Sequence, residues 1–340
     1  MKIALVILNW NGKQLLENFM PSIVNFSTVN NVEIYVADNA STDDSIAFVQ
    51  KTFPTVKIVQ NKKNGGFAKG YNDALKHIDA DIYGLVNSDI EVTNNWLDSI
   101  ISTFKTETNT AIIQPKILDY KNKELFEYAG AAGGFVDKYG YPFCRGRIFS
   151  ELEKDNSQFN DTSEIFWASG ACFFIKASVF NQLNGFDEDY FAHQEEIDLC
   201  WRAKNLNYSI KYVGTSTIFH VGGATLKEES PRKTFLNFRN SLFTLVKNLP
   251  KNQVFKIVFM RLLLDGIAGV KFLLEFRPMH TLAILKAHFS FYAQLSKMYK
   301  KRGNYKKRTD YFTIKSIVWE HFILGRKKYS EIGSDNNNCK

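Results

Sequence analysis

The sequence predicts an α/β protein with a doubly wound, mostly parallel sheet, an irregular insertion and a C-terminal helical extension. Through the first 115 residues, apolar runs of strand length alternate with segments whose apolar residues recur at helical spacing. This alternation is typical of repeated β–α–β units, in which helices cover both faces of the sheet. With 45% apolar and 23% charged residues, the composition excludes fibrous and wholly disordered proteins.

Each expected element can be assigned to a range. Buried strands are expected at 3–8, 32–37, 56–60, 81–87 and 111–114. Helices are expected between them, three with a Ser, Thr or Asn near the start as a cap, at 12–26, 41–53, 65–78 and 93–104. Residues 116–165 lack a clear period and predict the insertion. Strands at 168–175 and 208–213 should follow it, with helices near 176–183, 195–205 and 230–248, and from 254 onward.

Positive charge is concentrated at the C-terminal end of the chain. Residues 251–340 hold 18 Lys and Arg against 6 Asp and Glu, whereas residues 1–250 hold 25 against 29. A basic tail on a mildly acidic body predicts contact with a polyanionic surface. The alternative is that these charges only serve solubility.

Cysteine usage and the N-terminal residues predict a cytoplasmic protein. The four cysteines form no Cys-x-x-Cys pair and no disulfide framework. The apolar run at 3–8 is too short for a signal peptide, and no stretch of about 18 apolar residues predicts a membrane span.

Polar motifs follow the predicted strands, where doubly wound sheets bind ligands. Asp38 and Asn39 end the second strand, and Ser41 follows them. A carboxylate there can accept a hydrogen bond from a nucleobase or a ribose, although a helix-cap cluster is the alternative. Gly65 and Gly66 allow a ligand to approach the backbone before a helix start, but the dinucleotide and P-loop spacings are absent.

Two further motifs carry acids. The triplet Asn87, Ser88 and Asp89 ends the fourth strand, where a carboxylate suits a hard divalent cation, although such triplets are more often turns. The segment 186–204 interleaves acids with aromatic and apolar residues, and partly buried acids with raised pKa values can take a proton from a hydroxyl. His220 precedes a glycine pair, and by itself a single His is more often structural.

Taken in order, these motifs resemble the family 2 inverting glycosyltransferases of GT-A fold, in particular the bacterial rhamnosyltransferase-like branch. The resemblance runs from residue 3 to about 248 through ILNWNG, DNASTDDS, NGGFAKGYN, NSD, ASGACFFIKASVFNQLNGFDE, HQEEIDLCWR and FHVGGAT. It implies a catalytic domain at 1–250, with a nucleotide-binding half at 1–115 and an acceptor half at 116–250. The basic helical extension covers 251–330, and 331–340 is expected to be disordered.

The resemblance also assigns roles to single residues. It implies that Asp38 binds the base and that the nucleotide-sugar also contacts Asn9, Asn39, Ser41, Asn64, Gly65, Gly66, Asn87 and Ser88. It implies a divalent cation, Mn²⁺ or Mg²⁺, at Asp89 and His220, although Asn87 replaces the first acid of the Asp-x-Asp motif. The implied catalytic base is Glu196, which stands where Asp is usual, or one of its neighbours Glu195 and Asp198.

The resemblance implies transfer of one sugar, with inversion, from a dTDP- or UDP-sugar to a glycan or lipid-linked acceptor of the cell envelope. Nucleic acid is not an expected partner. A nucleotidyltransferase and a catalytically impaired nucleotide-sugar-binding scaffold are the rival functions. The helices at 254–276 and 281–295 and the basic run 297–308 predict peripheral docking on an anionic membrane; the alternative is packing on the catalytic domain or a homodimer.

Overall fold

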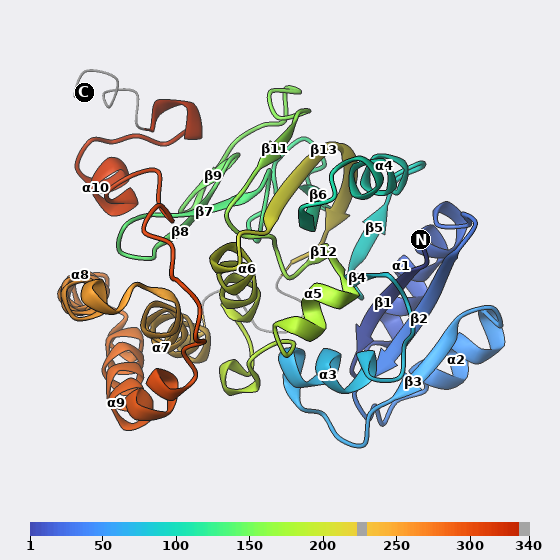
Figure 1. The fold of residues 1–340 in the computed structure, drawn as a ribbon, viewed down its shortest axis with the longest axis horizontal. Coiled ribbons are helices and arrows are strands. Elements are labelled where there is room, and N and C mark those ends of the chain that lie inside the picture. The colour runs from blue at the N-terminus through green and yellow to red at the C-terminus, as the bar shows by residue number, and fades with distance from the viewer. Residues whose placement is uncertain (223–229, 333–340) are drawn as a thin grey trace.

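The structure is a computed structural model, which describes residues 1–222 and 230–332. A mixed sheet runs through its centre, helices cover both faces, and the C-terminal helices stand together at one end of the molecule (Figure 1). Of residues 331–340, which were expected to be disordered, 333–340 lie outside the described residues.

The N-terminal half of the sheet is parallel. Its strands follow the order β4-β1-β2-β3, with β1 at Ile3–Asn9, β2 at Val32–Asp38, β3 at Lys57–Gln60 and β4 at Ile82–Asn87. These are four of the predicted strands, within a residue or two at each end. Most apolar side chains of β1 and β4 are buried because helices lie on both faces, whereas those of the edge strand β3 are half-buried.

The second half of the sheet is mixed. It contains the strands β5 (Ile90–Val92), β6 (Thr110–Asp119), β11 (Thr162–Glu164), β12 (Cys172–Lys176) and β13 (Ser209–His220). Strand β12 runs antiparallel between β4 and β6, and β13 pairs parallel with β6. The predicted strand at 208–213 therefore continues, through a register shift, as far as His220.

Helices form a layer on each face of the sheet. One apolar cluster joins the sheet to α1 (Lys13–Phe26), α2 (Ser45–Thr52) and α4 (Asp98–Thr106). The other joins it to α3 (Gly66–Leu75), α5 (Ala177–Gln182) and α6 (Glu195–Asn205). The doubly wound α/β class predicted from the sequence is confirmed.

The insertion forms a small antiparallel sheet beside the main one. Its strands are β7 (Gly134–Val136), β8 (Pro142–Cys144), β9 (Arg147–Ile148) and β10 (Glu151–Leu152). Strands this short leave little regular period in a sequence, which explains why only a partly β segment was expected there.

The C-terminal helices pack on one another and on the domain. They are α7 (Pro231–Asn248), α8 (Lys251–Leu274), α9 (Pro278–Lys300) and the short α10 (Ile317–Phe322). Residues 301–316, expected to continue the helical region, instead run back to the insertion, where Ile314 and Ile317 pack against Phe143 and Ile148. Within the described residues, no helix is both long enough and apolar enough to cross a bilayer.

Candidate active site

Three polar residues share the carboxyl edge of the parallel strands. Asn9 ends β1 and is aligned with Asp38 at the end of β2, while Leu8 is aligned with Asn87 at the end of β4. Parallel strands bring their carboxyl ends to one edge, which is where such sheets bind ligands. The strand-end residues proposed from the sequence therefore lie side by side.

Asn9 and Asp38 form one buried hydrogen-bond network with Ser41. The Asn9 Nδ2 atom donates to Asp38 Oδ1 at 3.1 Å and to Ser41 Oγ at 3.1 Å, and the Ser41 amide donates to Asp38 Oδ2 at 3.0 Å. The buried Oδ1 atom of Asn9 has no hydrogen-bond partner. A Cβ at Gly12 would lie 2.5 Å from that atom, so glycine keeps the space beside this free acceptor open.

The glycine turn lies next to this network. The Asn39 side chain donates to the Gly66 carbonyl at 3.0 Å, and Asn64 Oδ1 accepts from the Gly66 amide at 2.9 Å. Gly66 has a φ of 80°, and a Cβ there would lie 2.8 Å from the Phe191 carbonyl oxygen. Only glycine allows this approach, which joins the 64–66 turn to the segment that leads into α6.

Asp89 and His220, 131 positions apart in the sequence, are in contact. His220 Nε2 lies 3.2 Å from Asp89 Oδ1, and Nδ1 lies 3.3 Å from Glu127 Oε1 without hydrogen-bond geometry. Burial lowers the pKa of His220, but the two carboxylates outweigh it and raise the pKa to about 10. The two carboxylates therefore favour the protonated form of the imidazole.

The donor set fits a hard divalent cation only in part. Carboxylate oxygens such as those of Asp89 and Glu127 are the ligands that Mg²⁺ or Mn²⁺ prefers, whereas a protonated His220 cannot ligate. Among residues 1–222 and 230–332, no group of three or more His, Cys, Asp or Glu side chains is arranged to hold a metal ion.

The three candidate bases have different environments. Asp198 is fully buried, and its carboxylate accepts hydrogen bonds at 2.8 Å each from Lys247, Arg202 and Asn248. Burial alone raises its pKa, but the two cations bring the pKa well below the usual range. A carboxylate held in this way has no free oxygen for a substrate proton, so the geometry disfavours Asp198 as the base.

Glu195 and Glu196 differ from Asp198 because each has a buried carboxylate oxygen without a partner. Burial raises the pKa of Glu196 to about 7, and burial together with the charge of Glu196 raises the pKa of Glu195 well above its usual range. Glu195 is 4% exposed, whereas Glu196 is only half-buried. Glu196 is thus the more exposed residue of the pair, although its unpartnered oxygen is itself buried.

Glu196 borders the strand edge that carries the polar triplet. A Cβ at Gly170 would lie 3.5 Å from the Phe67 ring and 3.8 Å from the Glu196 carboxyl carbon. The neighbouring Ala171 carbonyl accepts from the Asn87 amide at 2.9 Å. The structure therefore brings Glu196 close to the end of β4.

The segment before α6 has an unusual backbone that is held from α7. Phe191, His193 and Gln194 have φ values of 65°, 68° and 73°, a conformation that side chains disfavour. The buried Asn240 side chain donates to the carbonyls of Tyr190, Ala192 and His193 at 2.8 to 3.0 Å. These bonds fix the backbone that aims Glu196.

Neither Asn240 nor Glu127 was identified from the sequence. Asn240 is a polar residue inside the apolar helix pattern of α7, and that interruption was an available signal. Glu127 lies in the insertion, where the absence of a clear period gave no indication of its burial.

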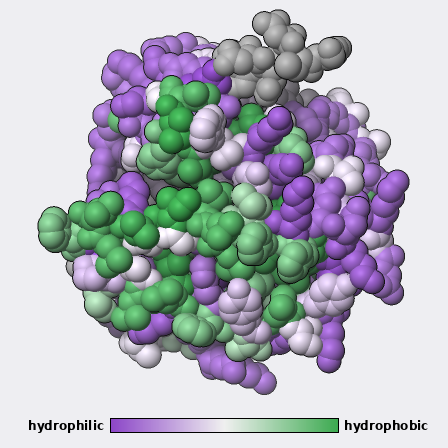
Figure 2. Space-filling view, turned by 90° about the vertical axis from the view of Figure 1, so that its left-hand side faces the viewer, coloured by the Kyte–Doolittle hydropathy of each residue, from purple (hydrophilic) through white to green (hydrophobic). Residues whose placement is uncertain are grey.

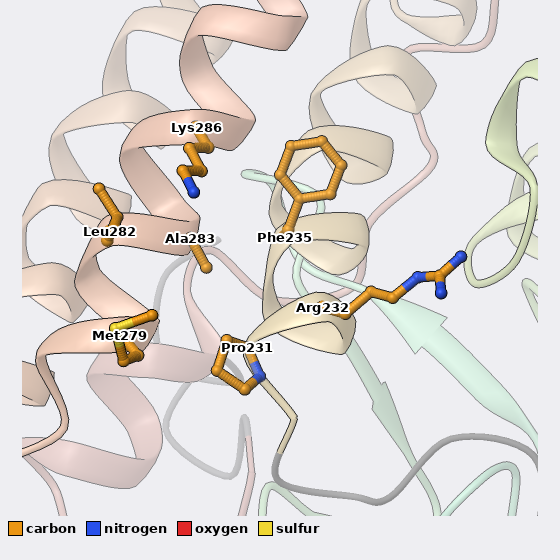
Figure 3. Close-up of a pocket in the computed structure, with 7 residues that line it drawn as sticks. All are labelled: Pro231, Arg232, Phe235, Met279, Leu282, Ala283 and Lys286. Atoms are coloured by element: carbon orange, nitrogen blue, oxygen red, sulfur yellow. The ribbon is translucent and has the colours of Figure 1, made fainter.

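A small pocket of about 190 Å³ lies between the beginnings of α7 and α9 (Figure 3). Its walls are mostly apolar, from Pro231, Phe235, Met279, Leu282 and Ala283, with Lys286 at one side. Arg232 extends away from the pocket, and its guanidinium lies 5.2 Å from the centre of the Phe191 ring. The pocket therefore adjoins the segment that leads to Glu196.

Comparisons with known proteins agree with this arrangement. The family model described as Glycosyl transferase family 2 matches residues 4–183. The low-salt glycan biosynthesis hexosyltransferase Agl10 of Haloferax volcanii is 22% identical over 282 residues, which cover 80% of this chain and 85% of that protein. The N-acetylglucosaminyl-diphospho-decaprenol L-rhamnosyltransferase of Mycobacterium tuberculosis is 23% identical, covering 64% of this chain and 75% of that protein.

Solved structures are similar in fold. The mannosyltransferase PcManGT from Pyrobaculum calidifontis, in complex with GDP-Man and Mn²⁺, matches with a TM-score of 0.53 at 12% identity over 86% of this chain and 87% of its own. GalNAc-T7 with UDP, GalNAc and Mn²⁺ matches with a TM-score of 0.54 at 15% identity, over 64% of this chain and 43% of its own. The GT-A fold expected from the sequence is confirmed.

Proposed function

The chain belongs to glycosyl transferase family 2, and from this premise we propose that it transfers one sugar, with inversion, from a nucleoside-diphosphate sugar to a hydroxyl group of a glycan or lipid-linked acceptor. The observation that carries the proposal is Glu196, a half-buried residue whose carboxylate has a buried, unpartnered oxygen beside the ligand-binding edge of the sheet. A glycosyltransferase needs one such base, placed where an acceptor can reach it.

In the proposed reaction, Glu196 takes the proton of the acceptor hydroxyl while that oxygen attacks the anomeric carbon. The bond from the anomeric carbon to the diphosphate breaks, and its electron pair leaves with the nucleoside diphosphate. Attack opposite the leaving group inverts the anomeric centre, as in single-displacement glycoside hydrolysis. Burial and the charge of Glu196 raise the pKa of Glu195, which disfavours a second negative charge beside Glu196.

The donor is proposed to bind along the strand ends. Asp38, in its network with Asn9 and Ser41, would accept from the base or ribose, and the 64–66 turn would face the phosphates. We favour a dTDP- or UDP-sugar for this site.

The divalent cation is proposed to bind the carboxylate of Asp89 and the amide oxygen of Asn87, at the end of β4. When bound, such a cation neutralises the charge that develops on a diphosphate leaving group. His220 does not fit as a ligand while it is protonated, so we propose that it orients Asp89 and supplies positive charge nearby.

The acceptor is proposed to approach from the side of the pocket between α7 and α9, because Arg232 connects that pocket to Phe191. A lipid-linked acceptor of cell-envelope synthesis is supported by the apolar pocket walls and by the name of the mycobacterial relative.

The experiment is a panel of dTDP-, UDP- and GDP-sugars, screened first by thermal shift with Mn²⁺ or Mg²⁺ because a bound ligand stabilises the fold. Donors that stabilise the protein are then tested for release of the nucleoside diphosphate with lipid-linked and soluble glycan acceptors. We expect turnover with one donor class and an inverted linkage in the product. Binding of a donor without turnover for any acceptor would instead support a nucleotide-sugar-binding scaffold.

A further inference from the structure

Helix α8 has the reverse of the usual amphipathic arrangement. Its inward face contains the buried pair Arg261 and Asp265, joined at 2.8 Å, and Asp265 also accepts from Tyr141 at 3.0 Å. Its outward face exposes large apolar side chains at intervals of three or four residues, namely Phe255, Phe259, Leu263, Ile267, Val270 and Leu274. A helix that faces water ordinarily buries such a stripe and exposes its charges.

The apolar surface continues onto the neighbouring helices. On α9 the exposed side chains Leu282, Leu285, Phe289 and Tyr292 recur at the same helical spacing. Between the helices, Phe276 is 93% exposed, and α10 and the residues after it expose Trp319, Phe322, Ile323 and Leu324. Figure 2 shows these apolar side chains gathered on the side of the molecule where α8, α9 and α10 lie. We refer to this surface as the apolar face.

Contiguous apolar surfaces of this kind mark a place where something binds. Cations accompany the apolar face: Lys256 and Lys271 lie on the exposed side of α8, and Lys286 and Lys300 on that of α9. Residues 251–300 contain only two acids, of which Asp265 is buried and Glu275 pairs with Lys271. The face is therefore apolar and positively charged together.

This charge decides between two occupants. In a symmetric dimer the same patch meets itself, so the lysines of one copy would approach those of the other. An anionic lipid surface offers an apolar interior for the Phe and Leu side chains and negative headgroups for the lysines. Trp319 and Tyr292 are residue types that favour the boundary between the two.

We propose that α8, α9 and α10 lie on an anionic lipid bilayer, with the apolar face inserted into the headgroup boundary and no helix crossing the membrane. Leu282, which belongs to the apolar face, and the exposed Met279 also line the pocket of Figure 3. Docking would therefore bring that pocket close to the lipid surface. It would also bring the segment leading to Glu196 near the lipid, because Arg232 beside the pocket contacts the Phe191 ring.

Of the cations in the basic run 297–308, Lys300 is exposed on α9, but several others are engaged within the protein. In the basic run 297–308, Lys301 pairs with Asp187 and Asp189, and Arg302 donates to the Val246 and Leu249 carbonyls. Arg308 pairs with Asp310, and burial lowers the pKa of Lys307 to about 8. Much of this run serves packing within the protein, so neutralising it would test folding rather than docking.

The test measures co-sedimentation of the full chain with vesicles of phosphatidylcholine alone and of phosphatidylcholine with phosphatidylglycerol, over a range of salt. The wild-type protein should bind the anionic vesicles, and more weakly as salt increases. Phe255→Gln with Ile267→Gln should weaken this binding by about tenfold or more, because both side chains lose the apolar contact. The matched control is Phe26→Gln with Val29→Gln, two exposed apolar residues in and after α1.

The charge arm neutralises Lys256, Lys286 and Lys300 to Gln. At about fivefold per lysine near an anionic surface, binding to the anionic vesicles should fall roughly 100-fold. The matched control neutralises Lys51, Lys105 and Lys121, which are exposed on other elements. Thermal unfolding verifies that each variant folds, and no step of the assay requires turnover, so failure here is distinct from failure of the proposed function.

Two results would overturn the proposal. One is wild-type protein that stays in the supernatant with anionic vesicles at low salt, or control variants that lose as much binding as the test variants. The other is a wild-type dimer, seen by sedimentation velocity, that Phe255→Gln with Ile267→Gln converts to a monomer while vesicle binding is unchanged. That outcome would identify a second copy of the chain as the occupant.

Discussion

Replacing Glu196 with Gln should inactivate the protein and, at neutral pH, stabilise it. Burial raises the pKa of Glu196 from its ordinary 4.5 to about 7 in the folded protein. Each pKa unit corresponds to about 1.4 kcal/mol, so ionised Glu196 destabilises the fold by about 3 kcal/mol above pH 7. A carboxyl group that destabilises the fold in this way is a candidate for a functional role rather than a stabilising one.

The sign of the effect sets the pH range of the experiment. At pH 4 and below, the carboxyl is protonated in both the folded and the unfolded states and costs nothing. Stability is then lost as pH rises from about 4.5 to about 7, because the folded state resists ionisation. Urea unfolding at pH 8 should show Glu196→Gln more stable than wild type by about 3 kcal/mol, and the difference should vanish near pH 4.

The same substitution that raises the stability of the fold should lower turnover. A base must be ionised, so the wild-type rate should rise with pH through a midpoint near 7. Glu196→Gln should lower turnover by about 10²- to 10⁴-fold, with donor binding nearly unchanged.

The matched control is Glu195→Gln. Burial and the charge of Glu196 raise the pKa of Glu195 well above its usual range, which favours the neutral carboxyl that Gln resembles, so we expect turnover and stability to change little. If Glu196→Gln keeps turnover within threefold of wild type, or if Glu195→Gln suffers the larger loss, the assignment of the base is wrong.

Three further predictions concern the donor side and its support. Asp89→Asn should remove the stimulation of turnover by Mn²⁺ or Mg²⁺ while the fold survives; equal activity of both proteins with and without chelator would exclude a cation there. Asp38→Ala should weaken nucleotide binding by about tenfold in calorimetry, because the buried carboxylate, hydrogen-bonded to Asn9 and Ser41, lies at the site proposed for the nucleobase or ribose. Asn240→Ala, which removes one hydrogen-bond donor from each of three carbonyls, should destabilise the fold by about 1–3 kcal/mol and lower kcat more than donor KM; a change in stability alone would show that Asn240 only packs.

The regular elements of the first half could be predicted because their periods are local. Continuous apolar runs such as 3–8 and 82–87 are typical of strands buried on both faces of a sheet, so they predict parallel strands even when the neighbouring strands are unknown. The strand order β4-β1-β2-β3 comes from the structure, and it places Asp38 and Asn87 at one edge of the sheet.

The C-terminal helices show where a period is not enough. Their length was evident from the sequence, but the direction of each face was not, because Arg261 and Asp265 could equally have faced water. They turn inward since Ser241 and Tyr141, far away in the chain, hold them there. The apolar side chains of α8 therefore face outward, which a reading of the helix alone would reverse.

The active-site residues also fall into those that the sequence indicates and those that only the tertiary structure identifies. By itself, the sequence determined which residue types end the strands and that an acidic cluster begins α6, because strand ends and helix starts are local features. Only the tertiary structure decided which acid is free: Asp198 is held by Lys247 and Asn248 from α7, whereas Glu196 has no such partner and meets Gly170 instead. The pKa of a carboxyl depends on burial and on neighbouring charges, and both come from segments that only folding brings together.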